Sequence, residues 1–318
     1  MLTTFLLASK QLLILLIMAL IGFALRKASV IRDSDRSCFS WVVLKLALPA
    51  LILYSFQDNI SGNMGSRLLI AFLFFTAVII ISYGIGEFSA RISHCPREKR
   101  GVWLFGSMFT NGGNLGMVIL SALYTGDVLI YAAFYMFLAN IFQATLGAAV
   151  MNRYRLDDGL REKKNFVKEI LSNTPIMAGI VGCLLLVFRI RLPDFCMDTL
   201  SSLKNLTAPL VMLTVGSTMA DAKLKTFIHN RYLHIHTAMR LIFLPLFSFA
   251  VFYYIGGVEK ALVINLVLRT AMPCAANTVI FADQYNNDTV FASQLVFLST
   301  MLSVLTIPVF VSLLTLIP

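Results

Sequence analysis

The sequence predicts an all-α membrane protein with ten transmembrane helices, arranged as two inverted five-helix repeats in which helices 4 and 9 are broken at membrane depth. Three observations lead to this fold class. Of the 318 residues, 58% are hydrophobic and only 13% are charged, whereas soluble domains carry about 25% charge. Apolar runs that can cross a hydrocarbon core of about 30 Å recur along the whole chain. Two of these runs are interrupted by helix-breaking residues at matching places in the two halves.

The apolar runs predict helices, in chain order, at 4–25, 37–57, 67–91, 101–123, 127–150, 167–189, 198–220, 236–256, 259–282 and 290–316. The first run lacks the basic start and the cleavage site of a signal peptide, so we expect it to remain as the first helix. The scattered cysteines form no C-x-x-C pair and are expected to be buried thiols. The histidines lie near segment ends, and neither a metal site nor a cofactor is expected.

The basic residues predict the orientation in the membrane. The net charge of +10 could indicate a nucleic-acid partner, but the Lys and Arg residues lie in short connections between apolar runs. They concentrate in alternate loops, which is typical of the cytoplasmic loops of membrane proteins. We therefore expect a multi-pass protein of the cell (inner) membrane with both termini outside and the loop 152–165 in the cytoplasm.

The two halves of the chain resemble each other. Gly22 and Gly182 are separated by the same offset as Pro49 and Pro209, within short similar stretches. The matches are few, so chance is the alternative, but the equal offset and the matching positions of segments 4 and 9 favour a repeat. The expected organisation is a first repeat at 1–151, a linker at 152–165 and a second repeat at 166–318. Because five segments is an odd number, the second repeat is inverted, as in many secondary transporters.

The interruptions predict a binding site. The fourth segment contains "FTNGGNLGMVI" at 109–119, and the ninth contains "RTAMPCAANTVI" at 269–280. Glycine permits unwinding and proline removes a backbone donor, and irregular backbone at membrane depth is tolerated where it lines a cavity. Close helix packing is the alternative role of the glycines. We favour a substrate site, with half-helix N-termini aimed at it, formed by Asn111, Gly112, Gly113, Asn114, Pro273 and Asn277. Pro49 is expected to kink its helix, with a place in the cavity lining as its alternative role.

Basic residues inside the apolar segments suggest an anionic substrate. Lys45 and Arg269 lie deep in their segments, whereas for Arg240, about one turn inside, burial and snorkelling to the interface are equally expected. No carboxylate lies near the breaks, which argues against a cation exchanger. We include Lys45 and Arg269 among the substrate-binding residues. The alternative for Arg269 is a hydrogen bond to backbone carbonyls that Pro273 leaves without a donor.

The chain resembles the auxin efflux carrier family, the bacterial relatives of the plant PIN auxin transporters. The resemblance covers essentially the whole chain and rests on "LKLALPALILYSF" at 44–56, "NGGNLGMVI", "LTAPLVMLTVGSTMA" at 206–220 and "AMPCAANTVIFADQY" at 271–285. It implies crossed, broken fourth and ninth helices, a scaffold domain, a transport domain, and often a homodimer through the scaffold. It also implies organic anions as substrates. Arg269 is not part of the family pattern, so its role depends on position alone.

The predicted function is a secondary transporter of efflux type that moves a small organic anion, such as an auxin-like or dicarboxylic acid, by alternating access. The alternative is a membrane-embedded sensor that binds a ligand in the same fold without transporting it. An enzyme is not expected, because the chain has no H-E-x-x-H motif, no paired helical aspartates and no P-loop.

Overall fold

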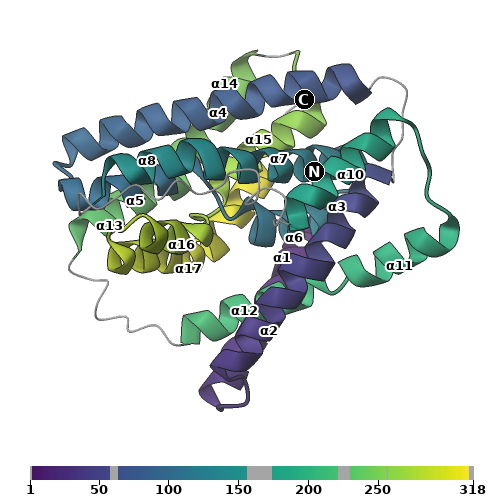
Figure 1. Cartoon of the computed structure of the whole chain (residues 1–318), viewed down its shortest axis with the longest axis horizontal. Coiled ribbons are helices and arrows are strands. Elements are labelled where there is room, and N and C mark those ends of the chain that lie inside the picture. The colour runs from purple at the N-terminus through teal and green to yellow at the C-terminus, as the bar shows by residue number, and fades with distance from the viewer. Residues whose placement is uncertain (1, 58–63, 156–173, 221–229, 256, 315–318) are drawn as a thin grey trace. The chain divides into compact units, whose positions relative to one another are not determined.

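The computed structural model describes residues 2–57, 64–155, 174–220, 230–255 and 257–314, and every regular element in these ranges is a helix (Figure 1). The first half contains α1 (Leu2–Lys27), α2 (Asp33–Val42), η1 (Val43–Ala47), α3 (Leu48–Gln57), α4 (Met64–Ile92), α5 (Arg97–Met108), η2 (Gly112–Gly116), α6 (Met117–Leu123), α7 (Asp127–Phe142), η3 (Gln143–Gly147) and α8 (Ala148–Arg153). The second half contains α10 (Thr174–Val187), α11 (Asp194–Lys204), α12 (Thr207–Ala220), α13 (Arg231–Ala238), η5 (Met239–Phe243), α14 (Leu244–Ile255), α15 (Lys260–Ala271), α16 (Asn277–Gln284) and α17 (Thr289–Leu314). The η elements are single π-helical turns.

These elements match the predicted segments closely, with one exception. The segment predicted at 198–220 is two helices, α11 and α12, separated at residues 205–206. In the described part of the chain, five helices are long and apolar enough to cross a membrane: Asp33–Gln57, Ser66–Ile92, Asp127–Arg153, Arg231–Tyr254 and Thr289–Leu314. The start of the sixth predicted segment, 167–173, and most of the loop 152–165 lie outside the described residues. The number of ten membrane crossings and their orientation therefore remain predictions.

Two of the π-helical turns precede prolines at the same spacing. Pro49 is the second residue after η1, and Pro245 is the second residue after η5. A proline inside a helix lacks an N–H, and its ring clashes with the carbonyl group one turn earlier. The wider i→i+5 turn relieves that clash, so both helices continue through the proline.

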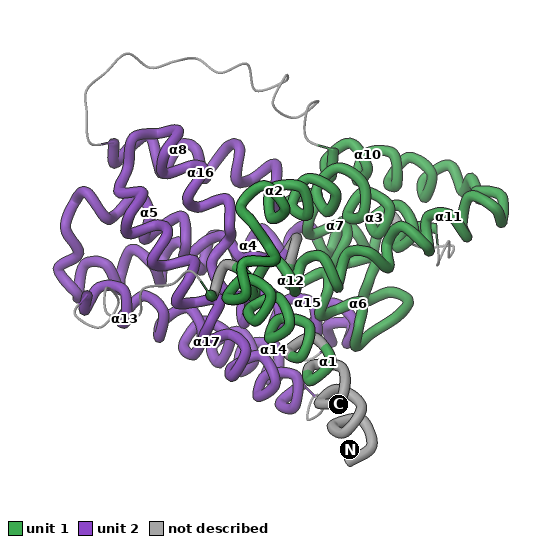
Figure 2. Tube along the Cα trace, turned by 90° about the horizontal axis from the view of Figure 1, so that it is seen from below, with its two compact units in different colours: residues 1–71, 113–138, 167–222 green, residues 72–112, 139–166, 223–318 purple. Residues whose placement is uncertain are grey.

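The chain divides into two compact units, and each unit combines segments of both halves (Figure 2). Unit 1 comprises residues 1–71, 113–138 and 167–222, and unit 2 comprises residues 72–112, 139–166 and 223–318. The predicted repeats at 1–151 and 166–318 are stretches of related sequence, whereas the two units are groups of residues that contact one another.

Unit 1 is held together by close backbone contacts at glycines. A Cβ atom on Gly22 of α1 would lie 2.8 Å from Leu213 Cα of α12, and one on Gly216 of α12 would lie 2.9 Å from the Phe23 nitrogen of α1. Gly182 of α10 packs against Phe56 of α3, where a Cβ atom would lie 3.0 Å from Cγ of the ring. Small residues allow such contacts between membrane helices. Helix α1, which begins the first half, thus packs against α12 in the second apolar segment of the second half. Helix α10, which begins the second half, packs against α3 in the second apolar segment of the first half.

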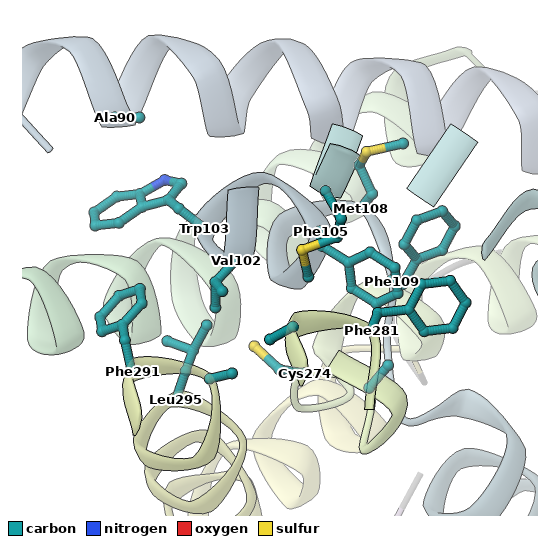
Figure 3. Packing of buried hydrophobic residues seen from close by; sticks show 14 of the residues in the cluster. Ala90, Val102, Trp103, Phe105, Met108, Phe109, Cys274, Phe281, Phe291 and Leu295 are labelled. Carbon is teal, nitrogen blue, oxygen red and sulfur yellow. The ribbon is translucent and has the colours of Figure 1, made fainter. Parts of the chain in front are cut away.

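Unit 2 contains a core of buried side chains that surrounds the interruptions of the fourth and ninth predicted segments (Figure 3). Trp103, Phe105 and Phe109 are fully buried, as are Cys274 and Leu295. The Phe105 ring lies 4.8 Å from the Phe109 ring and 4.9 Å from the Phe281 ring, measured between centroids. The core therefore fixes the helices on both sides of the two interruptions.

Candidate functional site

The two interrupted helices pair with each other in unit 2 through their backbones. Helix α5 ends at Met108 and helix α15 ends at Ala271, and Thr110 then faces Cys274 in an isolated antiparallel bridge. Asn111 N–H donates to the Pro273 carbonyl at 2.8 Å, and Ala275 N–H donates to the Phe109 carbonyl at 3.2 Å. Each break thus satisfies backbone groups of the other, as buried irregular backbone requires. We call residues 109–112 and 272–276 the crossover.

The first break lies slightly earlier in the chain than the glycines suggest. The non-helical residues are Phe109, Thr110 and Asn111, whereas Gly112 already begins the π-helical turn η2. The glycines therefore follow the non-helical residues, and the φ of Gly112 lies outside the left-handed region. Gly112 is instead required for space. A Cβ atom there would lie 3.2 Å from Arg269 Cζ and 3.1 Å from Thr110 Oγ1.

Arg269 places a guanidinium group directly against the first break. Arg269 is only 1% exposed, and it belongs to the last turn of α15, shortly before Pro273. Thr110 Oγ1 approaches the same glycine, is buried, and makes no hydrogen bond to any residue that the structure describes. Asn111 is 9% exposed beside it. The arrangement brings Asn111, Gly112, Arg269 and Pro273 together and adds Thr110, which the sequence analysis did not select.

Arg240 supplies the donors that the two breaks remove. In an unbroken helix Ser107 O would accept from Asn111 N–H, but that N–H bonds to Pro273. Arg269 O would accept from residue 273, which as proline has no N–H. Arg240 Nη1 donates to Ser107 O at 3.1 Å, and Arg240 Nη2 donates to Arg269 O at 3.4 Å. One buried guanidinium therefore caps the C-terminal ends of both α5 and α15, where the helix dipoles carry partial negative charge.

The structure thus resolves the open question about Arg240, which is buried rather than snorkelling, at 1% exposure. It also changes the expected electrostatics of the breaks. The sequence predicts half-helix N-termini at the breaks, but Arg240 contacts half-helix C-termini. The spacing of His236 and Arg240, one helical turn apart, was the signal in the sequence that could have identified this buried face.

His236 extends the same polar cluster toward α5. Its Nε2 atom lies 2.9 Å from the Trp103 carbonyl oxygen and 3.1 Å from Ser107 Oγ, and its ring meets the Trp103 ring edge to face at 5.0 Å. Ser107 Oγ in turn donates to the Trp103 carbonyl at 2.8 Å. Together, His236 and Arg240 attach the helix α13–η5 to the end of α5.

Asn277 lies at the start of α16 and is half-buried. Its Nδ2 donates to Gln143 Oε1 at 2.9 Å, so this amide is attached to the π-helical turn η3. Gln143 is 7% exposed and was not selected from the sequence. Nothing in its sequence pattern distinguishes Gln143 from a polar residue on a helix surface.

The other predicted site residues are placed as follows. Lys45 and Pro49 belong to unit 1, where Lys45 in η1 is exposed and Pro49 in α3 is buried. The backbones of Gly113 and Asn114 form part of η2, and their side-chain environments lie outside the described residues. Among the residues that the structure describes, no three His, Cys, Asp or Glu side chains are grouped closely enough to hold a metal ion.

Comparison with known proteins identifies the family. A family model described as membrane transport protein matches residues 7–311. The chain belongs to the auxin efflux carrier family. An uncharacterized transporter of Methanocaldococcus jannaschii is 26% identical over 93% of this chain and 95% of its own length. An uncharacterized transporter of Methanothermobacter thermautotrophicus is 24% identical over 95% of this chain and 96% of its own length.

Membership in the auxin efflux carrier family, together with several long apolar helices, makes this chain a multi-pass membrane protein of a transporter family. The resemblance inferred from the sequence motifs is therefore confirmed. The family is one of membrane transporters.

Proposed function

We propose that this chain is a secondary transporter that moves a small organic anion, such as an auxin-like or dicarboxylic acid, across the cell membrane by alternating access. The observation that carries the proposal is the position of Arg269, whose buried guanidinium lies against Gly112 at the crossover. Charged side chains inside membrane proteins are costly to bury, and those that occur mark substrate or ion pathways.

The chemistry around Arg269 suits a carboxylate. A guanidinium offers a planar set of donors that matches two carboxylate oxygens. Thr110 Oγ1 adds a hydroxyl that has no hydrogen-bond partner among the described residues. Gly112 has no side chain, and the Arg269 guanidinium occupies the space that a Cβ atom would take, close to Thr110 Oγ1. We infer that the substrate carboxylate binds to Arg269 and Thr110, with Asn111 beside it.

The pairing of helices in unit 1 supports an inverted repeat. Helix α1 packs on α12 and α10 packs on α3, each through a glycine, Gly22 or Gly182, at corresponding positions of the two halves. A two-fold axis in the membrane plane, relating helices 1 and 2 to helices 6 and 7, would generate this reciprocal pairing. The orientation with both termini outside, and a homodimer through a scaffold domain, are part of the same proposal.

Transport by reconstituted protein tests the proposal. Proteoliposomes containing the full chain are loaded with radiolabelled candidate organic acids, and efflux is measured at a fixed membrane potential. Arg269→Gln removes the charge but keeps donors, and it should weaken anion affinity more than tenfold, or about 1.4 kcal/mol. Arg269→Lys should retain part of the affinity. The matched control is Arg91→Gln, which changes an exposed arginine.

Two results would contradict the proposal. If Arg269→Gln transports with wild-type affinity, the guanidinium is structural and the anion site lies elsewhere. If wild-type protein binds an organic acid, measured by thermal stabilisation, but never moves it across the vesicle membrane, the sensor alternative is correct.

A further inference from the structure

Unit 2 contains a second site, beside the crossover, that the proposed transport function does not use. A groove of about 290 Å³ lies between α4 and the helix formed by η3 and α8. Its apolar lining residues are Ile79, Ile80, Met108, Leu146, Ala149 and Val150, and its polar lining residues are Tyr83 and Arg153. We propose that this groove binds one acyl chain of an anionic phospholipid, with the phosphate group at Arg153.

The wall of the groove belongs to a surface that faces hydrocarbon. Helix α4 carries the most apolar of the long spans, with a mean hydropathy of 2.6 and only 28% of its window buried. Ile80 on one rim is 59% exposed, and Leu146 on the other rim is 42% exposed. Exposed isoleucine and leucine on such a span are in contact with lipid. An occupant that enters from this side is therefore a membrane component.

The two polar residues lie toward one end of the groove. Helices α4 and α8 run in the same direction (Figure 1), and Arg153 is the last residue of α8. Arg153 is exposed, and its guanidinium lies 5.6 Å from the centre of the Tyr154 ring, which supports the charged group near the groove end. The proposed orientation places this end on the cytoplasmic side, where arginines attract anionic lipid headgroups.

The other charges near this end do not cancel the attraction. Glu87, one turn after Tyr83 on α4, accepts a hydrogen bond from Arg91 Nε at 2.8 Å, and the two form an ion pair. The Glu87 carboxylate is therefore already compensated, as is Asp288, which pairs with Lys99 at 3.5 Å. Arg153 supplies a positive charge at the end of the groove. A phosphate diester complements that charge, whereas a zwitterionic headgroup does so only in part.

The dimensions of the groove favour an acyl chain over a helix. An α-helix about 10 Å wide that rises 5.4 Å per turn occupies about 400 Å³ per turn. The groove holds about 290 Å³ and is lined almost entirely by carbon. One helical turn is therefore too large to be enclosed by this groove, whereas a flexible hydrocarbon chain is not.

The floor of the groove gives the lipid a contact with the crossover. Met108, 5% exposed, is the last residue of α5, and Figure 3 shows its side chain pointing toward the helix that carries Ala90. The next residue, Phe109, accepts the backbone hydrogen bond from Ala275. An acyl chain on Met108 therefore packs behind the first break and should stabilise it.

Lipid binding to the purified full chain tests the inference. Native mass spectrometry in detergent would compare phosphatidylglycerol with phosphatidylcholine of the same acyl chains. Wild type should prefer phosphatidylglycerol about fivefold, since one basic residue near anionic lipid contributes about 1 kcal/mol. Arg153→Gln should abolish the preference, and Arg153→Lys should keep it. Arg231→Gln, which changes an exposed arginine of α13 that does not line the groove, is the matched control and should bind like wild type.

A groove-filling variant and a headgroup probe complete the test. Ala149→Phe should weaken binding of both lipids, and glycerol phosphate without acyl chains should not compete with phosphatidylglycerol. Thermal stability without added lipid establishes that each variant is folded. An unchanged preference in folded Arg153→Gln, or competition by glycerol phosphate alone at lipid concentrations, would overturn the inference.

Discussion

Replacing Arg240 with methionine should destabilise unit 2 more than replacing an exposed arginine with methionine. The change keeps much of the side-chain volume but removes the hydrogen bonds to Ser107 O and Arg269 O, beside the crossover. The bond to Ser107 O at 3.1 Å has ordinary length, whereas the bond to Arg269 O at 3.4 Å is long, and Met272 N–H also donates to that second carbonyl at 3.2 Å. The first bond is therefore the main loss.

The magnitude follows from these distances. A hydrogen bond from a charged donor contributes about 1.5–3 kcal/mol, so we assign about 2 kcal/mol to the first bond and about 1 kcal/mol to the second. Removal of the buried charge relieves its desolvation, which acts in the opposite direction. However, Ser107 O then remains buried without this donor, and an unsatisfied buried acceptor costs about 1–3 kcal/mol of stability. We expect a net loss of about 3 kcal/mol.

Thermal unfolding in detergent micelles measures the loss. For a unit of this size, each kcal/mol lowers the Tm by about 2–4 °C, so Arg240→Met should unfold about 6–12 °C below wild type. Arg240→Lys should be intermediate, because an ammonium group does not span two carbonyl oxygens as a guanidinium does. Arg91→Met, which breaks an exposed ion pair with Glu87, should change the Tm by about 2 °C or less. Equal Tm values for Arg240→Met and Arg91→Met would refute this account of the crossover.

Three further predictions concern the crossover, the topology and the thiols. Gly112→Ala should reduce both the Tm and transport because its Cβ displaces the neighbouring guanidinium, whereas Gly84→Ala, which has open space around it, should be neutral; similar behaviour of the two variants would contradict the assigned contact. A cysteine introduced in the loop 152–165 of an otherwise cysteine-free chain should resist impermeant maleimide in intact cells, and rapid labelling would reverse the orientation. Burial raises the pKa of the Cys95 thiol to about 11. At pH 8 maleimide should therefore modify the exposed Cys38 far faster than Cys95, and equal rates at that pH would contradict the burial of Cys95.

The positions of the helices were predictable from the sequence because hydropathy and chain length act locally. Every apolar run in the described ranges is helical, and Pro273 correctly located the second break, since a proline without an N–H ends the hydrogen-bond ladder wherever it occurs. The first break was less well located. Phe109 and Thr110 carry no helix-breaking signal, and their extended conformation depends on hydrogen bonds to Pro273 and Ala275, far away in the sequence.

The side-chain contacts of the candidate site were predictable only in part. An arginine deep in an apolar run is unusual in itself, so Arg269 could be selected from its position. Arg240 lies close enough to a helix end that its length permits either burial or snorkelling, and only the location of Ser107 O decides between them. The partner of Asn277, Gln143, lies in another predicted segment, and no local pattern connects two amides that meet through tertiary packing.

The backbone bridge at the crossover also constrains how the chain can be assembled in a membrane. Asn111 N–H and the Phe109 carbonyl bond to residues 273–275, which the ribosome adds more than half the chain later. Until then, the first interrupted helix has polar backbone groups that hydrocarbon cannot satisfy. The N-terminal half is therefore an incomplete folding intermediate that depends on insertion machinery or water for these groups. A chain truncated before Pro273 should be a substrate for membrane quality control, even though every helix of its first half has been made.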